Sequence, residues 1–329
     1  MLTRRAALAL PALAMPAIAL APRPAPAQPA WSPSRPVRFV VPFAPGGATD
    51  IVARVLSEPM TERLGQPVTV ENRTGAGGNV GVENVVRSAA DGHSILMGTT
   101  GTLTINPHLY PNMGFNPLTD LAPVGLAFST DHVLIVHSSV TARTAQEFLD
   151  LVWAQPGRLS YGSGGNGTST HTVAELFKLV ARVDIQHVPY RGSAPALNDT
   201  VAGTVQVMLD QVASALPMIQ AGRVRALAVT GSRRHAALPD VPTVGEIGLA
   251  AAEATSWGAV MAPAGTPAPV IERLNATIRE ALSLQPVQDR LRQSGAEPWS
   301  STPAELATYL RAETEKWARV VREARIGLG

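Results

Sequence analysis

The stretch VRFVVPFAPGGATDIVARVL, residues 37–56, is typical of the first strand and helix of an α/β fold. Residues 37–42 form an apolar run of the kind that becomes a buried strand, and Gly46 and Gly47 follow it in a turn. Thr49 or Asp50 then caps a helix whose apolar residues share one face. We expect Pro59 to kink or shorten this helix.

The alternation of strand and helix continues along the chain and restarts in its middle. A parallel sheet with helices on both faces produces this pattern, so we expect two α/β units, each a doubly wound, mostly parallel sheet. Pro267 and Pro303 each begin a further helix near the end of the chain, the second running to about residue 325. The other predicted strands cover 68–71, 94–99, 159–162, 185–190 and 205–210, and the other predicted helices 79–90, 145–153, 170–181 and 194–201.

Composition excludes several classes of protein. The 329 residues are 45% hydrophobic, which suffices for one large or two medium cores. The chain has no cysteine, so thiol catalysis and thiolate metal sites are excluded. Aromatic residues make up only 5%, which leaves few platforms for stacking bases or sugars.

The first 27 residues are predicted to be a secretion signal. Arg4 and Arg5 precede an apolar run over residues 6–20, and Ala25-Pro26-Ala27 supplies a cleavage site after Ala27. The arginine pair also admits a twin-arginine signal. Without this segment 24 basic and 25 acidic residues remain, so the mature chain carries a formal charge of −1 and gives no case for nucleic-acid binding. We expect export to the periplasm.

Three glycine-rich loops stand between predicted strands and helices, at residues 43–50, 72–79 and 162–171. In open parallel sheets, ligands bind outside the carboxyl ends of strands, where the first N–H groups of helices favour an anion. The sequence therefore predicts a negatively charged ligand. The alternative is that the glycines only form tight turns.

Four side chains near these loops are further candidates, each with a structural alternative. Asp210 ends a predicted strand, where its carboxylate would either select a cationic group of the ligand or stabilise the hinge between the two α/β units. His171 lies near a helix start and would touch the ligand or cap the helix. Phe43 and Tyr190 would face a cleft or pack under their own helices.

Enzyme motifs are incomplete in this chain. Gly162, Gly164 and Gly167 match G-x-G-x-x-G, but Asp184 precedes the next strand instead of ending it. Tyr190-Arg191 occupies the end of that strand, which leaves an NADP-binding hypothesis. Ser163 completes no nucleophile motif, and there is no phosphate-binding loop of the G-x-x-x-x-G-K type. His132 and His137 are predicted on opposite faces of one strand, so they cannot share a metal. We predict no catalytic residue, no metal and no cofactor.

Seven ordered motifs give the chain a family resemblance. After a secretion signal, the chain resembles the Bug-type extracytoplasmic solute receptors, the substrate-binding components of tripartite tricarboxylate transporters. His93 stands where a tyrosine is usual, and Arg191 where lysine is common. The motifs are PFAPGGATD (42–50), ENRTGAGGN (71–79), DGHSILMG (91–98), GSGGNGTSTH (162–171), VPYRG (188–192), LPDVPT (238–243) and WGAVMAPAGTP (257–267).

The resemblance implies a two-lobed periplasmic binding protein of the Venus-flytrap type, with two crossovers between lobes near Ser129 and residues 252–256. Residues 33–128 and 256–329 would form lobe 1, and 129–255 lobe 2. A small organic acid would be held by the turn at 46–49, partly through ordered water, with residues 163–169 and the region of Asp210 opposite. The candidate ligand-binding residues are Phe43, Gly46, Gly47, Ala48, Thr49, Asp50, Thr99, Thr100, Ser163, Gly164, Thr168, Ser169, His171, Tyr190 and Asp210.

The implied protein is a monomer that catalyses no reaction and delivers its ligand to the permease subunits of a membrane transporter. Two other hypotheses stay open from the sequence. One is an NAD(P)-dependent oxidoreductase, and the other is a ligand sensor that uses the same fold for a signalling partner.

Overall fold

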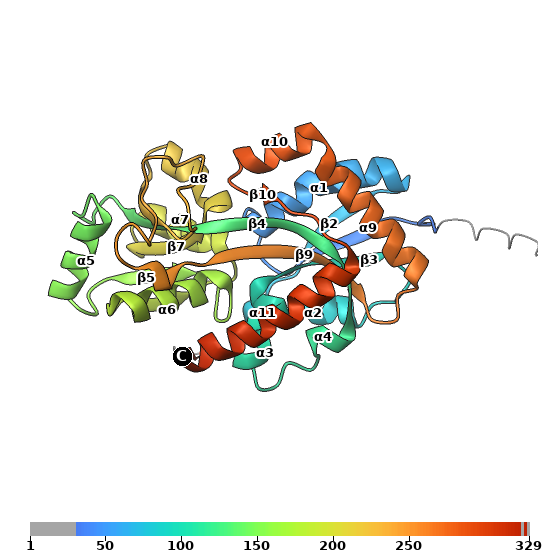
Figure 1. Cartoon of the computed structure of the whole chain (residues 1–329), viewed down its shortest axis with the longest axis horizontal. Helices are drawn as coiled ribbons and strands as arrows, with labels where there is room; N and C mark the ends of the chain where they lie inside the picture. The colour runs from blue at the N-terminus through green and yellow to red at the C-terminus, as the bar shows by residue number, and fades with distance from the viewer. Residues whose placement is uncertain (1–30, 324–325, 328–329) are drawn as a thin grey trace, which may run out of the picture.

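The computed structural model describes residues 31–323 and 326–327, so the predicted signal segment lies outside the described residues. The chain forms two lobes joined by two long strands, β4 (Leu121–His137) and β9 (Thr255–Pro263). The two strands pair antiparallel and run through the middle of the molecule (Figure 1). The chain thus passes from one lobe to the other along β4 and returns along β9.

The first lobe contains a sheet in the order β2-β1-β3-β9-β4. β1 pairs parallel with β2 and β3, whereas β9 is antiparallel to β3. The sheet is therefore mixed, with three parallel strands beside the two crossing strands. Its elements before the first crossing are β1 (Val37–Val41), α1 (Ala48–Leu64), β2 (Val68–Asn72), η1 (Ala76–Gly78), α2 (Asn79–Val86), β3 (Ser94–Thr99), η2 (Gly101–Ile105), α3 (Asn106–Leu109) and α4 (Pro117–Asp120). Those after the return are α9 (Ala268–Ser283), α10 (Gln285–Gln293), β10 (Glu297–Pro298) and α11 (Pro303–Glu323).

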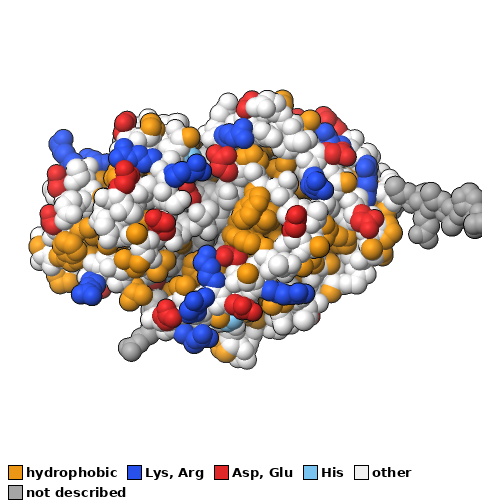
Figure 2. Space-filling view, viewed as in Figure 1, with side chains coloured by type: hydrophobic (Ala, Val, Ile, Leu, Met, Phe, Trp, Pro, Cys, Tyr) orange, Lys and Arg blue, Asp and Glu red, His pale blue; other side chains and the backbone are white. Residues whose placement is uncertain are grey.

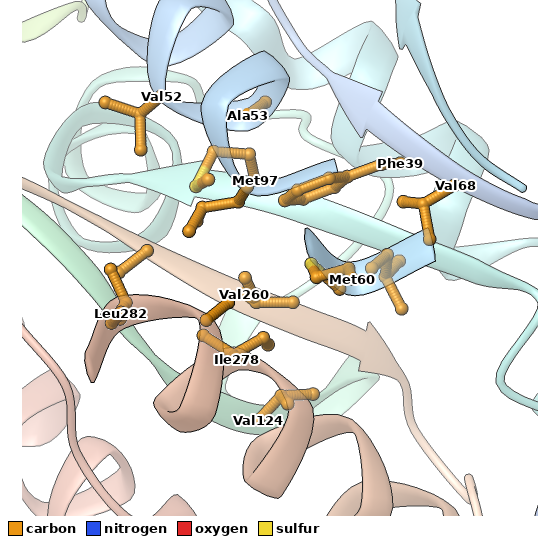
Figure 3. Packing of buried hydrophobic residues seen from close by; sticks show 14 of the residues in the cluster. Phe39, Val52, Ala53, Met60, Val68, Met97, Val124, Val260, Ile278 and Leu282 are labelled. Atoms are coloured by element: carbon orange, nitrogen blue, oxygen red, sulfur yellow. The ribbon is translucent and has the colours of Figure 1, made fainter. Parts of the chain in front are cut away.

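The largest core of this lobe lies between the sheet and the helices α1 and α9. Figure 3 shows Phe39, Met97 and Val260 on three adjacent strands, packed with Met60 of α1 and Ile278 of α9. All five side chains are fully buried. Because this packing fixes α1 on the sheet, it also fixes the position of the first turn of α1 at the carboxyl end of β1.

The second lobe repeats the arrangement. β5 pairs parallel with β6 and β7, and β4 pairs antiparallel with both β7 and β8. A separate core, built around Phe148, Tyr161 and Phe177, supports this sheet. The elements are α5 (Ala145–Ala154), β5 (Ser160–Ser163), α6 (Ser169–Ala181), β6 (Gln186–Pro189), α7 (Ser193–Ala202), β7 (Val207–Gln211), α8 (Val212–Gln220), β8 (Val224–Val229) and η3 (Ala250–Ala252).

Two helices differ in length from the sequence-based expectation. α1 continues through Pro59 to Leu64, because its buried residues Leu56, Met60 and Leu64 stay packed in the core on both sides of the proline. α2 ends at Val86 instead of near residue 90. The chain after it turns toward β3, with the Asp91 carboxylate accepting a hydrogen bond from the His93 N–H.

The surface mixes charges of both signs. Figure 2 shows acidic and basic side chains interspersed over the face viewed, with Lys and Arg gathered near the end of α11. Within the part of the chain that the structure describes, no helix is long and apolar enough to cross a bilayer.

Candidate ligand-binding site

A pocket lies between the two lobes, where the carboxyl ends of the parallel strands of each lobe face one another. The space between its atoms, including the mouth, is about 390 Å³. A water-sized sphere can occupy only about 20 Å³ of it, so in this form the pocket has room for little more than one water molecule. Six lining residues come from each lobe: Phe43, Gly47, Ala48, Thr49, Asp50 and Thr99 from the first, and Gly164, Thr168, Ser169, Thr170, Ser193 and Gln211 from the second.

Four helices begin at this pocket. α1 comes from the first lobe, and α6, α7 and α8 come from the second. In each of the four, the N-cap residue makes no side-chain hydrogen bond to the first turn. By contrast, Thr144 at the start of α5, away from the pocket, accepts a hydrogen bond from the Glu147 N–H. The helices at the pocket therefore present first-turn N–H groups that no cap side chain satisfies.

The electrostatics of the pocket come from the main chain. No Lys, Arg or His is among the lining residues of the described chain, and Asp50 is the one ionisable residue there. Each helix N-terminus carries about half a positive charge, so four together supply on the order of two. This field favours an anion.

Asp50 builds the turn of the first lobe. Its Oδ2 accepts hydrogen bonds from Gly46 N (2.9 Å) and Arg54 Nε (2.9 Å), and its Oδ1 accepts one from Asn72 Nδ2 (2.9 Å). Asn72 Nδ2 also donates to the Phe43 carbonyl (2.9 Å). Burial alone would raise the pKa of Asp50, but these three donors hold it below its ordinary value. The carboxylate is thus a positioning group whose charge is compensated.

Two threonines shape the facing loop of the second lobe. Thr170 Oγ1 accepts a hydrogen bond from Gly164 N (2.8 Å), and Thr168 Oγ1 donates to the Gly165 carbonyl (2.7 Å). Gly165 has φ +114°, a conformation that residues with a Cβ rarely adopt. The loop therefore brings its main chain to the pocket in a conformation that requires glycine.

The two lobes are in contact beside the pocket, so the structure is the closed form. Tyr110 of the first lobe donates its hydroxyl to the Asn166 carbonyl of the second at 2.8 Å. A Cβ at Gly192 of the second lobe would lie 3.0 Å from Ala44 N of the first. The main chains of the two lobes meet closely only because glycine occupies such positions.

Nine of the predicted ligand-binding residues line this pocket, and six lie behind or beside it. Gly46 donates to Asp50 within the turn, and Thr100 Oγ1 accepts a hydrogen bond from Trp257 N (3.0 Å). Tyr190 donates its hydroxyl to Asp199 Oδ2 (2.6 Å). Ser163 and His171 bond to groups of the second lobe that are described below. The nine lining residues are Phe43, Gly47, Ala48, Thr49, Asp50, Thr99, Gly164, Thr168 and Ser169.

Asp210, the sixth, is fully buried under the pocket wall. Its Oδ2 accepts a hydrogen bond from Ser214 Oγ (2.6 Å). Burial raises the pKa of Asp210 to about 6, and hydrogen bonds from Ser214, Gln211 and Ser193 counter only part of this effect. Ser193 itself lines the pocket, so Asp210 lies one side chain away from the ligand space.

Sequence reasoning missed three lining residues: Thr170, Ser193 and Gln211. Thr170 lies within the glycine-rich loop 162–171, and Ser193 follows Gly192 at the start of α7. The sequence pattern could therefore have identified both as candidate ligand-binding residues. Gln211 was missed by one position. Gln211 lines the pocket, whereas its neighbour Asp210 is fully buried beneath the wall and receives a hydrogen bond from Ser193.

Metal binding has no support in the described residues. Over 31–323 and 326–327, no group of three or more His, Asp or Glu side chains is placed to hold a metal ion. His132 is fully buried, and burial lowers its pKa to about 3, so its ring is neutral.

Comparison with known proteins agrees with this geometry. Residues 52–326 match the model of the tripartite tricarboxylate transporter family receptor. The chain belongs to this receptor family. It is 43% identical over 295 residues to a protein from the tcbD-tcbE intergenic region of Pseudomonas sp. strain P51, covering 89% of this chain and 88% of that one. It is 37% identical over 292 residues to BugT of Bordetella pertussis, covering 88% and 90%. The predicted resemblance to Bug-type receptors is thereby confirmed.

Similar solved structures, which include periplasmic binding proteins, confirm the two-lobed fold. A Rhodopseudomonas palustris protein solved with adipate is 35% identical, with a TM-score of 0.87, covering 90% of this chain and 99% of that one. MatC from the same organism, solved with bound malate, is 35% identical with a TM-score of 0.84, covering 88% and 99%. The family is one of transporter receptors, and a periplasmic binding protein, BugD, is among the similar solved structures.

Proposed function

We propose that this receptor binds a small organic acid with two carboxylates in the pocket between its lobes. The observation that carries the proposal is the convergence of four helix N-termini without side-chain caps on a pocket whose lining, among the described residues, includes no basic side chain. One carboxylate would bind main-chain N–H groups in the first turn of α1. The other carboxylate would bind main-chain N–H groups in the first turns of the second-lobe helices. The two R. palustris relatives were solved with adipate and malate, and both ligands are dicarboxylates.

The cellular role extends this proposal. The chain would be exported by the signal segment at 1–27 and would act in the periplasm as a monomer. Residues 129–255 would close as one body against 33–128 and 256–329, bending where β4 and β9 cross. The closed form would deliver the acid to a membrane permease without any bond being made or broken.

Calorimetry on the mature chain tests the ligand class. Adipate and hexanoate have six carbons each and differ only in the second carboxylate. We expect adipate to bind at least about tenfold more tightly, a difference of about 1.4 kcal/mol, because the second carboxylate is the group that the facing helices receive. The same titration is repeated with malate and with citrate.

Equal affinity for adipate and hexanoate would contradict the two-carboxylate model. NADPH serves as the control for the oxidoreductase hypothesis. Binding of NADPH in the same titration, with no response to any acid, would replace the proposed function with that alternative.

A further inference from the structure

Two stacked histidines lie behind the ligand-facing loop of the second lobe. The rings of His171, at the start of α6, and His187, in β6, have centroids 4.2 Å apart and an interplanar angle of 17°. Tyr161 of β5 stacks on the other face of His187, at 4.8 Å and 19°. Neither histidine lines the pocket.

Each histidine is bonded to the loop rather than to the ligand space. His171 Nδ1 accepts a hydrogen bond from the Gly167 N–H at 3.2 Å. His187 Nε2 lies 2.6 Å from Ser163 Oγ, which itself accepts a hydrogen bond from the Gly165 N–H at 3.1 Å. The two rings thus hold the two ends of the segment 163–167.

These contacts fix where the ring protons are. Gly167 N can only donate, so Nδ1 of His171 is unprotonated and its proton is on Nε2. Ser163 is fully buried and its Oγ already accepts the Gly165 N–H, so we assign its hydroxyl proton to His187 Nε2, 2.6 Å away. His187 therefore accepts at Nε2 and carries its proton on Nδ1.

The surroundings keep both rings uncharged. Burial lowers the pKa of His171 to about 4 and that of His187 to about 3, and the charge of Lys178 adds to the effect while Glu175 opposes it. Glu175 is itself engaged, since its Oε1 accepts hydrogen bonds from the Tyr161 hydroxyl (2.6 Å) and Lys178 Nζ (2.7 Å). Two stacked imidazolium rings at this distance would also repel each other.

We propose that His171 and His187 are positioning residues: as a stacked neutral pair with opposite tautomers, they hold the loop 163–167 in the shape that presents the first turn of α6 to the ligand. Protonation of either ring would turn an acceptor into a donor facing the loop, so the pair works only when neutral. The proposal rests on the proposed function for its effect on binding, but its geometry can be tested without any ligand.

Nitrogen NMR of the ring atoms in the mature, ligand-free protein is the first test. At pH 7 we expect the unprotonated nitrogen to be Nδ1 in His171 and Nε2 in His187, with both rings still neutral at pH 5.5. A charged ring at that pH, or either tautomer reversed, would overturn the proposal.

Paired variants form the second test. Asparagine at 171 keeps an acceptor at the position of Nδ1, and glutamine at 187 keeps one at the position of Nε2, whereas leucine keeps neither. Amide hydrogen exchange at Gly167 should become about tenfold faster in His171→Leu, as expected for one lost hydrogen bond of about 1.4 kcal/mol. Exchange at Gly165 should also become faster in His187→Leu, because Ser163 Oγ, which accepts the Gly165 N–H, loses its partner on the ring. His187→Gln and His171→Asn should stay within about threefold of the parent protein.

Titration with adipate adds the functional readout. We expect the leucine variants to bind adipate about tenfold more weakly and the asparagine and glutamine variants to recover most of that loss. An equal loss of affinity in all four variants would mean that the rings only fill space. Unchanged affinity in all four would mean that the histidine hydrogen bonds do not position the loop for binding. If the parent protein itself does not bind adipate, the ligand class is wrong, and the ring and exchange measurements still decide the role of the histidines.

Discussion

Replacing Gly101 with alanine is expected to weaken ligand binding by about tenfold to hundredfold while the free protein stays folded. A Cβ at Gly101 would lie 2.9 Å from the Gly167 carbonyl oxygen and 3.2 Å from Thr168 Cα, both in the other lobe. The three nearest atoms outside its own helix backbone thus all belong to the other lobe, so the methyl group acts mainly against closure. Calorimetry with adipate measures the effect.

The same variant should leave the unfolding midpoint of the ligand-free protein unchanged or slightly raised, because alanine favours a helical conformation more than glycine does. Gly245→Ala is the control, since the three atoms nearest to its Cβ would be side-chain atoms of its own lobe, the closest being Glu253 Oε1 at 3.0 Å. We expect Gly245→Ala to change affinity by less than about threefold. Equal affinity of Gly101→Ala and the parent protein would show that the ligand does not require this closed form.

Replacing Asp50 with alanine is expected to cost about 2–3 kcal/mol of folding free energy and to weaken ligand binding at least about tenfold. The carboxylate accepts hydrogen bonds from Gly46, Arg54 and Asn72, so its loss leaves the turn of the first lobe without its central acceptor. Arg54→Ala is the control. Its side chain is 53% exposed, so its removal should cost less than about 1 kcal/mol.

The Asp50 effect should also depend on pH. Because the pKa of Asp50 is lower in the folded than in the unfolded state, its stabilisation is complete above the unfolded-state value near 3.8 and is lost as pH falls through the folded-state value. Urea unfolding at pH 7 and pH 3 measures this. The difference between the parent protein and Asp50→Ala should shrink at pH 3, and an unchanged difference would show that the carboxylate charge does not stabilise the turn.

The parts of the site that follow directly from local sequence were predictable. Glycine-rich segments between an apolar strand and a helix place main-chain N–H groups at the carboxyl edge of a sheet, and this signal located Gly47 to Asp50 and Thr168 to Ser169. Their arrangement around one shared pocket needed the lobes to be placed relative to each other, which the family resemblance supplied.

The rest depended on contacts between distant segments. β4 was not predicted in full, because Pro123 and Gly125 interrupt its apolar pattern, and the strand passes them with irregular pairing to β9. Gln211 was missed since the strand end was placed one residue early. His187 gave no signal, because its role comes from stacking on a histidine 16 positions earlier in the chain.

The central claim is that main-chain N–H groups of facing helices hold the acid. A crystal structure of the mature chain with adipate tests it most directly. We predict one carboxylate within about 3.2 Å of the Ala48 and Thr49 nitrogens and the other at a comparable distance from nitrogens in the first turn of α6 or α7. A carboxylate held by an Arg or Lys side chain, or an adipate bound outside the cleft, would contradict the account.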